Sequence, residues 1–403
     1  MQDTIVRRDH YLNILMSFKD EPLVKIITGM RRCGKSTLMH MFIADLKNSG
    51  VHDNDVVYLN FEDPLNARIR DGEKLLEKIM ATVELGKGTY LFFDEIQDVN
   101  GWEKAINSMR YAGADVYITG SNAKLLVSDF STYLSGRYVE IEMYPLSFRE
   151  YIRFFDDGAD TERLLFDYMA TGGLPYIALE RKSERNTDMI LSAAFDTVFI
   201  KDVVEKNNIR DVAALRNVTE FVMRNIGNVT STRSVSNYIV SKGGKMSPPT
   251  ADAYLDHLEA AYLIYRAKKY DVKRREYLRT SNKFYVSDLG VGSIIARYGD
   301  DNISGIIENI VFMELLFRSK KVTVGNINGN EIDFIILDKD KREYYQVTTE
   351  MYTPEVRDRE TRSLKMIPDD YPKTIITLQR YPSKNIDGIR VVALGDFLLE
   401  EFH

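Results

Sequence analysis

The residues with the most specific chemistry lie in the segment GMRRCGKST, residues 29–37. This segment fits the pattern G-x-x-x-x-G-K-[ST], and it stands between an apolar run, VKIIT, and a stretch with helical periodicity. In that context, backbone N–H groups of the turn and of the helix N-terminus bind phosphate oxygens. Lys35 then places a positive charge on the β- and γ-phosphates, and the hydroxyl of Ser36 is a ligand for Mg²⁺. We therefore expect ATP and Mg²⁺ to bind at this loop, which consists of Gly29, Met30, Arg31, Arg32, Cys33, Gly34, Lys35, Ser36 and Thr37.

Two acidic residues follow a second apolar run. In TYLFFDEIQDV, residues 89–99, four apolar residues predict a buried strand, and Asp94 and Glu95 come at its carboxyl end. Ligands of open α/β sheets bind at that end, so Asp94 is expected to hold Mg²⁺ and Glu95 to polarise an attacking water. The alternative, a strand that merely ends in two acidic residues, is disfavoured by the phosphate loop. Another buried run, VYITGSN, ends at Asn122, whose amide can hydrogen-bond the γ-phosphate or the water.

Arg137, in LSGRY, is expected beyond the last strand of the sheet. An exposed arginine there could reach the γ-phosphate of a neighbouring subunit, so the sequence predicts a homo-oligomer in which Arg137 acts in trans. The spacing alone leaves a surface or packing arginine equally open. Cys33, the only cysteine, excludes an intramolecular disulfide, and we interpret it as a small loop residue rather than a redox switch.

The order of apolar and amphipathic stretches predicts the fold that positions these residues. From residue 23 to about 144, short apolar runs alternate with helical patterns, as in a parallel sheet with helical crossovers. From about 145 to 298 the pattern is mainly helical, with one strand pair near residues 262–285. After residue 305 a helix leads into strands again. We therefore predict an α/β protein with domain boundaries near residues 150 and 300.

The motifs ITGMRRCGKST, NFED, LFFDEIQDV, ITGSNAKLL, LSGRY and YPLSFREY follow one another between residues 5 and 151. In this order they resemble an AAA+ ATPase core of a prokaryotic branch. Such proteins commonly carry a winged-helix segment and a C-terminal domain of unknown function that resembles restriction endonucleases. The resemblance covers nearly the whole chain. It implies a P-loop NTPase core at 1–150, a mainly helical winged-helix region at 151–300, and a small restriction-endonuclease-like domain at 301–403.

The same resemblance implies roles for single residues. Lys35 belongs to the Walker A motif, Asp94 and Glu95 to the Walker B motif, and Asn122 to the sensor position. GGLP, residues 172–175, resembles a small-residue motif that such ATPases place near the nucleotide. A helix-breaking turn is the alternative interpretation of this motif.

The middle region carries the most localised positive charge. Its helices, Gly-Pro turn and hairpin resemble a winged helix-turn-helix, with residues 250–260 in the position of the recognition helix. The hairpin is expected to contact DNA phosphates through Lys268, Lys269, Lys273, Arg274 and Arg275. The expected recognition helix has three acidic residues and no Arg or Lys to read base edges. A winged helix used for packing, with lysines protecting an edge strand, therefore stays open, as does a protein partner.

The segment EIDFIILDKDKREYYQVTTE predicts two strands joined by a charged turn. A helix with Glu308 or Glu314, a strand with Asp333 and a strand with a polar triplet resemble, in this order, the PD-(D/E)xK nucleases. Their chemistry needs carboxylates to hold Mg²⁺ and a lysine to stabilise developing charge. Because Gln346 and Thr348 replace the last carboxylate and the lysine, we predict the fold without nuclease activity. An ATP-dependent nuclease is the alternative.

Bulk properties narrow the class of protein. A net charge of −6 and a pI near 5.6 argue against a surface covered with nucleic acid, although a local basic patch is compatible with them. We find no apolar run of membrane-spanning length and no signal-peptide pattern, so we expect a cytoplasmic protein with no membrane partner. We predict an ATPase that drives or gates contacts of its winged-helix and nuclease-like parts with DNA or a protein. A nucleotide-gated protein-interaction switch is a further alternative.

Overall fold

The computed structural model describes residues 6–66, 68–122, 136–155, 158–179, 184–319, 321–338 and 341–401. The chain divides into two compact units. The first contains Met1–Tyr144 with Ala260–Tyr262, and the second contains Pro145–Glu259 with Leu263–His403. This division lies close to the expected boundary at 150. Near residue 300, the other expected boundary, the second unit continues because one sheet runs through both parts.

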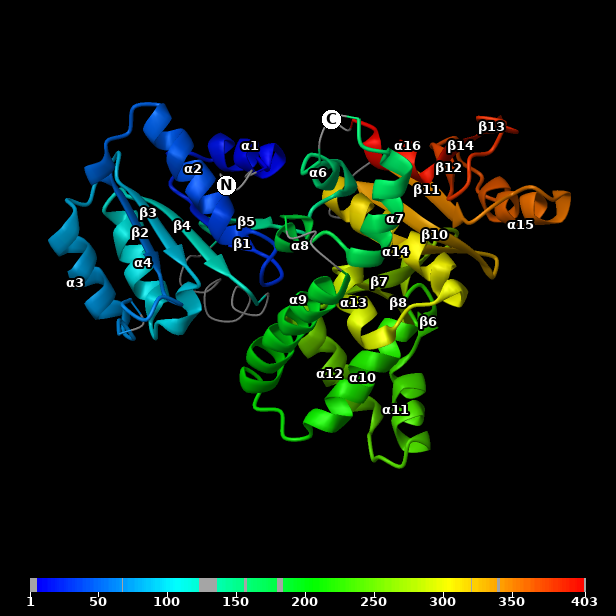
Figure 1. Cartoon of the computed structure of the whole chain (residues 1–403), viewed down its shortest axis with the longest axis horizontal. Coiled ribbons are helices and arrows are strands. Elements are labelled where there is room, and N and C mark those ends of the chain that lie inside the picture. The colour runs from blue at the N-terminus through cyan, green and yellow to red at the C-terminus, as the bar shows by residue number, and fades with distance from the viewer. Residues whose placement is uncertain are drawn as a thin grey trace. The chain divides into compact units, whose positions relative to one another are not determined.

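The first unit is built on a five-stranded parallel sheet with the order β2-β3-β4-β1-β5. Its strands are β1 (Val24–Thr28), β2 (Val56–Asn60), β3 (Tyr90–Asp94), β4 (Asp115–Gly120) and β5 (Tyr138–Glu142). Its helices are α1 (Asp9–Ser17), α2 (Lys35–Asn48), α3 (Gly72–Thr82) and α4 (Trp102–Tyr111) (Figure 1). The parallel sheet with helical crossovers confirms the predicted P-loop NTPase fold class.

Alternate side chains of the central strands face two helical layers. Phe93 of β3 belongs to an apolar cluster that includes buried residues of α3 and α4. Phe92, its neighbour, packs against Phe42 of α2, with ring centroids 6.3 Å apart. Helices α3 and α4 therefore cover one face of the sheet and α2 the other. Burial on both faces explains why the strands have continuous apolar runs rather than alternating ones.

The fifth strand was not predicted from the sequence. Among the described residues, β5 is an edge strand that pairs with β1, and one of its residues, Ile141, is buried. A strand that buries a single residue gives a weak apolar signal, so YVEIE does not stand out in the sequence. Arg137 consequently stands directly before the last strand of the sheet, and not beyond it as expected.

The second unit begins with helices and ends as an α/β module. Its helices are α6 (Phe148–Ile152), α7 (Thr161–Thr171), α8 (Pro175–Leu179), α9 (Glu184–Thr197), α10 (Val212–Arg224), α11 (Thr232–Ser241), α12 (Pro248–Ala260), α13 (Leu289–Ala296), α14 (Ile303–Arg318), α15 (Pro354–Lys365) and α16 (Leu394–Leu399), and a π-helix, Val198–Glu205, continues α9. Its strands are β6 (Val229–Thr230), β7 (Ile264–Asp271), β8 (Glu276–Val286), β9 (Val322–Ile327), β10 (Asn330–Asp338), β11 (Lys341–Thr348), β12 (Lys373–Thr377), β13 (Asn385–Ile386) and β14 (Ile389–Ala393). Among the described residues, no helix is long and apolar enough to cross a membrane.

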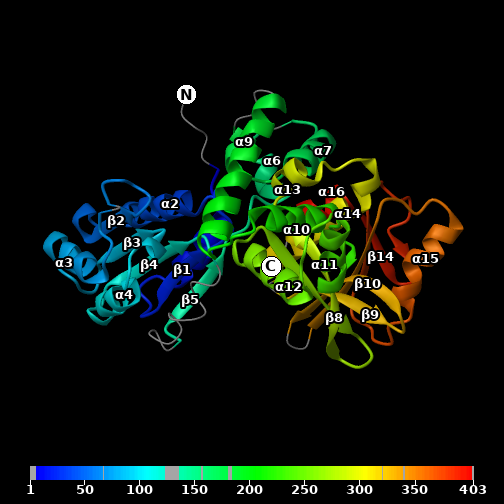
Figure 2. The same cartoon turned by 90° about the horizontal axis from the view of Figure 1, so that it is seen from below.

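These strands form one nine-stranded sheet with the order β13-β14-β12-β11-β10-β9-β7-β8-β6. At one end, β8 pairs antiparallel with both β6 and β7. Helices α10, α11 and α12 lie together in both views, and α10 packs on β8 (Figures 1 and 2). At the other end, α14 is followed by β9, β10 and β11 in antiparallel pairs, and β12 then joins β11 in parallel. The parallel pair β7–β9 connects the two halves into a single sheet.

Candidate functional site

The phosphate loop joins the carboxyl end of β1 to the start of α2. Its backbone takes positive φ angles at Gly29 (136°), Arg32 (70°) and Gly34 (106°). A Cβ atom on Gly29 would come within 2.1 Å of the carbonyl oxygen of Met143, so this position requires glycine. The two glycines of the motif are therefore explained by backbone conformation and close packing, which shape a loop whose amides can approach a phosphate.

Lys35 is buried at the first position of α2 and points back over the loop. Its Nζ donates to the carbonyl oxygens of Gly29 and Met30, at 2.9 and 3.2 Å. The same Nζ lies 3.6 Å from Oε1 of Glu95. The structure thus brings the lysine of the loop close to Glu95, the residue directly after β3.

The other loop residues differ in their surroundings. Met30 and Cys33 are buried, and burial raises the pKa of the Cys33 thiol, which favours its unreactive protonated form. Arg31 forms an ion pair with Glu62 of the NFED segment. Arg32 and Thr37 are exposed, while Gly34 and Ser36 are half-buried.

The strand order brings the acidic pair to the phosphate loop. Because β4 lies between β1 and β3, its final residues emerge between the loop and the acidic pair. The Thr119 hydroxyl donates to Oδ1 of Asp94 at 2.5 Å and accepts the backbone N–H of Glu95 at 2.8 Å. The Tyr58 hydroxyl donates to Oδ2 of Asp94 at 2.8 Å. Each carboxylate oxygen of Asp94 therefore has one hydroxyl donor, which fixes its orientation.

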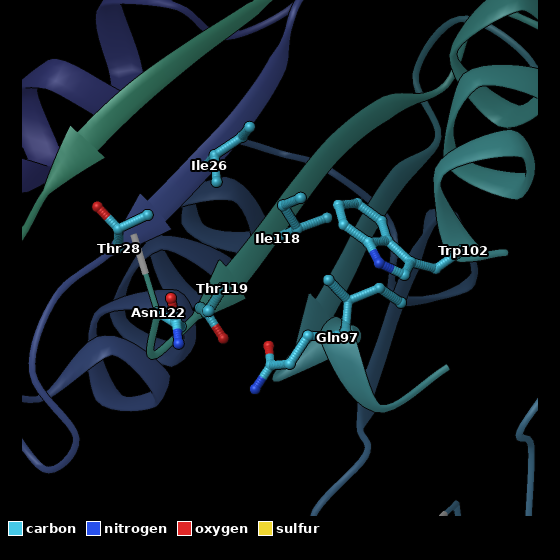
Figure 3. A pocket seen from close by; sticks show the side chains of 9 residues that line it. Ile26, Thr28, Gln97, Trp102, Ile118, Thr119 and Asn122 are labelled. Carbon is cyan, nitrogen blue, oxygen red and sulfur yellow. The ribbon is translucent and has the colours of Figure 1, made fainter. Parts of the chain in front are cut away.

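Glu95 adopts a left-handed backbone conformation, with a φ of 54°, that non-glycine residues seldom take. Its Oε2 accepts a hydrogen bond from Nε2 of Gln97 at 2.5 Å. Gln97 also lines a small cavity, of about 10 Å³, together with Thr119 and Asn122 (Figure 3). Asn122 is buried. The predicted sensor residue, the acidic pair and the phosphate loop thus lie at one edge of the sheet.

Sequence reasoning missed four polar residues that shape this site: Arg8, Tyr58, Gln97 and Thr119. Arg8 is buried and donates to the carbonyl oxygens of Cys33 and Tyr144, so it ties the phosphate loop to the segment after β5. The signal for Thr119 was its place at the end of an apolar run. Gln97 is marked by its spacing, two residues after the acidic pair. Tyr58 and Arg8 contact residues that are distant in the sequence, and their own neighbours in the sequence give no indication of these contacts.

Arg137 lies away from the nucleotide site of its own chain. It precedes β5, whose first residue pairs in register with Val24 at the start of β1. The phosphate loop follows the opposite end of β1, a strand of five residues that spans about 16 Å. Arg137 is exposed, and its Nη1 donates to the hydroxyl of Tyr111 at 2.6 Å. Arg137 therefore lies beside the opposite end of β1 from the phosphate loop of its own chain.

The GGLP motif is explained by close packing inside the second unit. Asp288, the N-cap of α13, accepts the backbone N–H of Gly173 at 2.7 Å and that of Val291 at 2.9 Å. A Cβ atom on Gly172, which has a φ of 75°, would lie 2.3 Å from Oδ1 of Asp288. Burial raises the pKa of Asp288 to about 6. These contacts favour the turn interpretation of the motif.

The basic hairpin is formed by β7 and β8 and the turn between them. Lys268, Lys273, Arg274 and Arg275 are exposed. Lys269 differs from the expectation, because its side chain is 18% exposed and its Nζ lies 3.6 Å from a Glu331 oxygen. Four of the five predicted basic residues thus remain on the surface.

The acidic residues of α12 pair with the hairpin. Arg266 of β7 contacts Asp256 at 2.6 Å, Glu259 at 3.3 Å and Asp252 at 3.5 Å. The acidic side chains that argue against base recognition by α12 therefore bind this helix to β7 through ion pairs.

The C-terminal module contains a buried cluster of charges. Lys283 of β8 is 4% exposed, and its Nζ lies 2.6 Å from Glu331, 3.1 Å from Glu308 and 3.8 Å from Asp333. Burial raises the pKa values of Glu308 and Asp333. Burial opposes protonation of Lys283, but the three carboxylates outweigh it and raise the pKa of the ammonium group. Tyr285 adds a hydrogen bond to Glu308 at 2.9 Å.

This cluster resolves two expectations. Glu308, not Glu314, is the helix acid that shares a partner with Asp333, because Glu314 pairs with Arg318 at 2.7 Å. Lys283, whose Nζ lies 3.8 Å from Asp333, comes from β8, a strand outside residues 301–403. Among the described residues, no group of three or more His, Cys, Asp or Glu side chains has a metal-binding arrangement.

Comparisons with known proteins support the P-loop fold. Residues 21–152 match the AAA domain family, and residues 162–302 match a domain of unknown function, DUF8612. An uncharacterized protein of Haemophilus influenzae is 36% identical over 405 residues, which cover 99% of this chain and 100% of the relative. An uncharacterized protein of Methanocaldococcus jannaschii is 30% identical over 344 residues, covering 81% of this chain and 75% of the relative. Among solved structures, a Walker-type ATPase of Pyrococcus abyssi has a TM-score of 0.50 at 16% identity, covering 73% of this chain and 97% of that chain.

Proposed function

Because the chain belongs to the same family as the Haemophilus influenzae and Methanocaldococcus jannaschii proteins and carries an AAA domain, we propose that it binds and hydrolyses ATP with Mg²⁺. The observation that carries this proposal is the 3.6 Å approach of the Lys35 Nζ to the Glu95 carboxylate. It brings the phosphate-binding lysine and the expected general base within reach of one γ-phosphate.

Each residue has a defined part in the proposed reaction. Loop amides and Lys35 bind the β- and γ-phosphates. Glu95 accepts a proton from a water molecule while the oxygen of that water attacks the γ-phosphorus. The bond between the γ-phosphorus and the β-γ bridging oxygen then breaks, which gives ADP and phosphate. Asn122, two residues after β4, donates an amide N–H to the γ-phosphate or to the water. Such general-base catalysis typically contributes 10²- to 10⁴-fold to the rate.

The residues present fit a Mg²⁺ ion. Magnesium prefers oxygen ligands, and the Asp94 carboxylate is held by two hydroxyl donors that leave lone pairs on both oxygens. Ser36, in the first turn of α2, would supply the second protein ligand. The ion held by these residues would supply charge neutralisation at the β- and γ-phosphate oxygens.

A pair of variants tests the proposal. Lys35→Ala should lose both ATP binding and turnover, whereas Glu95→Gln should retain binding and lose turnover by about 10²-fold or more. Binding is measured with a fluorescent ATP analogue and turnover by phosphate release. Full turnover in both variants would refute the proposed site.

We further propose that Arg137 acts in trans in a homo-oligomer. Its exposure and its distance from its own phosphate loop support a role at a neighbouring site. A mixing experiment tests this: Arg137→Ala and Lys35→Ala are each inactive alone, but together they regain activity, because one supplies the site and the other the arginine. If gel filtration with ATP finds only monomers and mixing restores nothing, Arg137 is a surface residue.

The second unit is proposed to contact DNA phosphates through the hairpin. The order α10, β6, α11, α12, β7, β8, with β8 between the other two strands, supports a winged helix. Reversing the charges of Lys273, Arg274 and Arg275 should weaken DNA binding and reduce the slope of log K against log salt by ~2.7, at 0.9 per phosphate contact. Reversal of three other exposed cations, Lys321, Arg359 and Arg380, serves as the control with the same change in net charge. An unchanged salt slope would favour a protein partner gated by ATP.

For the C-terminal module we propose a nuclease-like fold without nuclease activity. The order of α14, three antiparallel strands, α15 and a parallel strand supports the fold. Gln346 and Thr348 make their own contacts, with Ser363 and with the Glu350 carbonyl. DNA cleavage with Mg²⁺ or Mn²⁺ that is abolished by Asp333→Ala would establish the alternative, an ATP-dependent nuclease.

A further inference from the structure

Gln97 lies between the Glu95 carboxylate and a small cavity, and it has a polar group for each. We propose that Gln97 is a positioning residue that holds the Glu95 carboxylate through its amide nitrogen and binds one water molecule in the cavity through its amide oxygen. The consequence for turnover rests on the proposed ATP hydrolysis, while the contacts themselves do not.

The amide orientation follows from the carboxylate. Nε2 of Gln97 donates to Oε2 of Glu95 at 2.5 Å. Turning the amide over would place two acceptor oxygens against each other, so the carboxylate selects this orientation. Oε1 of Gln97 is then buried without a hydrogen-bond partner in the part of the chain that the structure describes. A buried acceptor without a donor is costly, and a bound water removes that cost.

The cavity has the size and polarity that a single water needs. Its volume of about 10 Å³ is close to the minimum for one water molecule. Its polar lining comes from Thr28, Gln97, Thr119 and Asn122, and Trp102 is among the apolar residues that close it. Figure 3 shows the Gln97 side chain extending toward Thr119. We expect a water bound there to donate to Oε1 of Gln97, the buried acceptor that lacks a hydrogen bond among the described residues.

The two oxygens of Glu95 consequently have different partners. Lys35 lies near Oε1, and Gln97 holds Oε2. When phosphates bind and attract the lysine, Gln97 continues to hold the carboxylate, so the base stays oriented during turnover. The left-handed backbone of Glu95 places its side chain between these two groups.

Two variants test the role in turnover. Gln97→Met keeps the length of the side chain but removes both hydrogen-bonding groups. We expect kcat to fall by about 10- to 100-fold, as for a misplaced catalytic group, with binding of the ATP analogue within about threefold of wild type. Gln97→Glu should lose about as much activity as Gln97→Met, because it places acceptor oxygens against Oε2 of Glu95. A kcat within twofold of wild type for Gln97→Met overturns the inference.

A second measurement does not depend on hydrolysis and separates this inference from the proposed function. In a cycle of Gln97→Met, Glu95→Met and the double variant, the shifts in unfolding midpoint should be non-additive, because each single change removes the same contact. A high-resolution crystal structure of the wild-type chain should contain a water bonded to Oε1 of Gln97. Additive shifts together with an amide turned away from Glu95 would refute the contact, even if the chain hydrolyses ATP. If the contact is present but the wild type lacks ATPase activity, the proposed function fails instead.

Discussion

Removing the Lys283 ammonium group is predicted to destabilise the second unit strongly. In Lys283→Met, three carboxylates lose the cation between them while the packing volume is largely kept. Removing one partner of a buried ion pair typically costs about 3–5 kcal/mol, because the remaining charge is left uncompensated. Lys283 and Glu308 are 4% and 12% exposed, so that range applies to their pair. Glu331 is 32% exposed, and solvent screening reduces its share.

The pH dependence of this loss has a defined sign. The pKa values of Glu308 and Asp333 are already raised in the folded chain, so folding favours their protonated forms. A carboxyl with a raised pKa stabilises the fold below its ordinary pKa, and that stability is lost as the pH rises through the folded value. Without Lys283 both pKa values rise further. The deficit of Lys283→Met should therefore be largest near pH 8 and shrink toward pH 4.

Urea unfolding of the full chain between pH 4 and 8 measures this deficit. Lys321→Met is the matched control, because the Lys321 side chain is 62% exposed and lies 3.8 Å from Asp338. Its cost should stay below about 1 kcal/mol, as for other surface pairs. A Lys283→Met deficit of similar size, or one that does not change with pH, would refute the account of the cluster.

Three further outcomes follow from buried contacts. Lys25→Met should lower the free energy of unfolding by about 3–5 kcal/mol, because Nζ of this fully buried lysine lies 2.5 Å from Asp115. Adding Asp115→Asn to the same chain should restore part of that free energy. Gly172→Ala should lower the melting temperature more than Gly50→Ala. Both glycines have positive φ angles, but a Cβ on Gly172 would meet a carboxylate oxygen, whereas a Cβ on Gly50 would meet nothing within 4 Å. Equal melting temperatures for the two glycine variants would contradict this. Tyr58→Phe, which removes a hydroxyl donor to Asp94, the proposed Mg²⁺ ligand, should raise the Mg²⁺ concentration for half-maximal ATP turnover by about 10-fold or more.

The phosphate loop and the acidic pair could be predicted because each is a short motif of consecutive residues. A glycine-rich turn, a lysine and an acidic strand end each follow a buried run, and parallel strands bring such ends to one edge. The contacts that orient the acids were not predictable. Thr119 and Tyr58 reach Asp94 across 25 and 36 residues of sequence, and only the strand order places them there.

The expected position of Arg137 was wrong for the same reason, because it too depends on the arrangement of the strands. Its position depends on β5, an edge strand with one buried residue, and edge strands lack the continuous apolar signal of central ones. Lys283 did carry a signal that was overlooked. A lysine directly before the apolar run FYV implies a buried counter-charge, because lysine is almost never fully buried unless it is paired.

The same lysine bears on how the second unit responds to ATP turnover. Lys283 belongs to the hairpin strand β8, and its partners belong to α14 and β10 of the C-terminal module. The hairpin is also continuous with that module through the β7–β9 pairing. Displacing the hairpin relative to the module would break both the strand pairing and a buried ion cluster. The proposed winged helix and the nuclease-like module should therefore move as one body, so any force from the ATPase would act on this body as a whole.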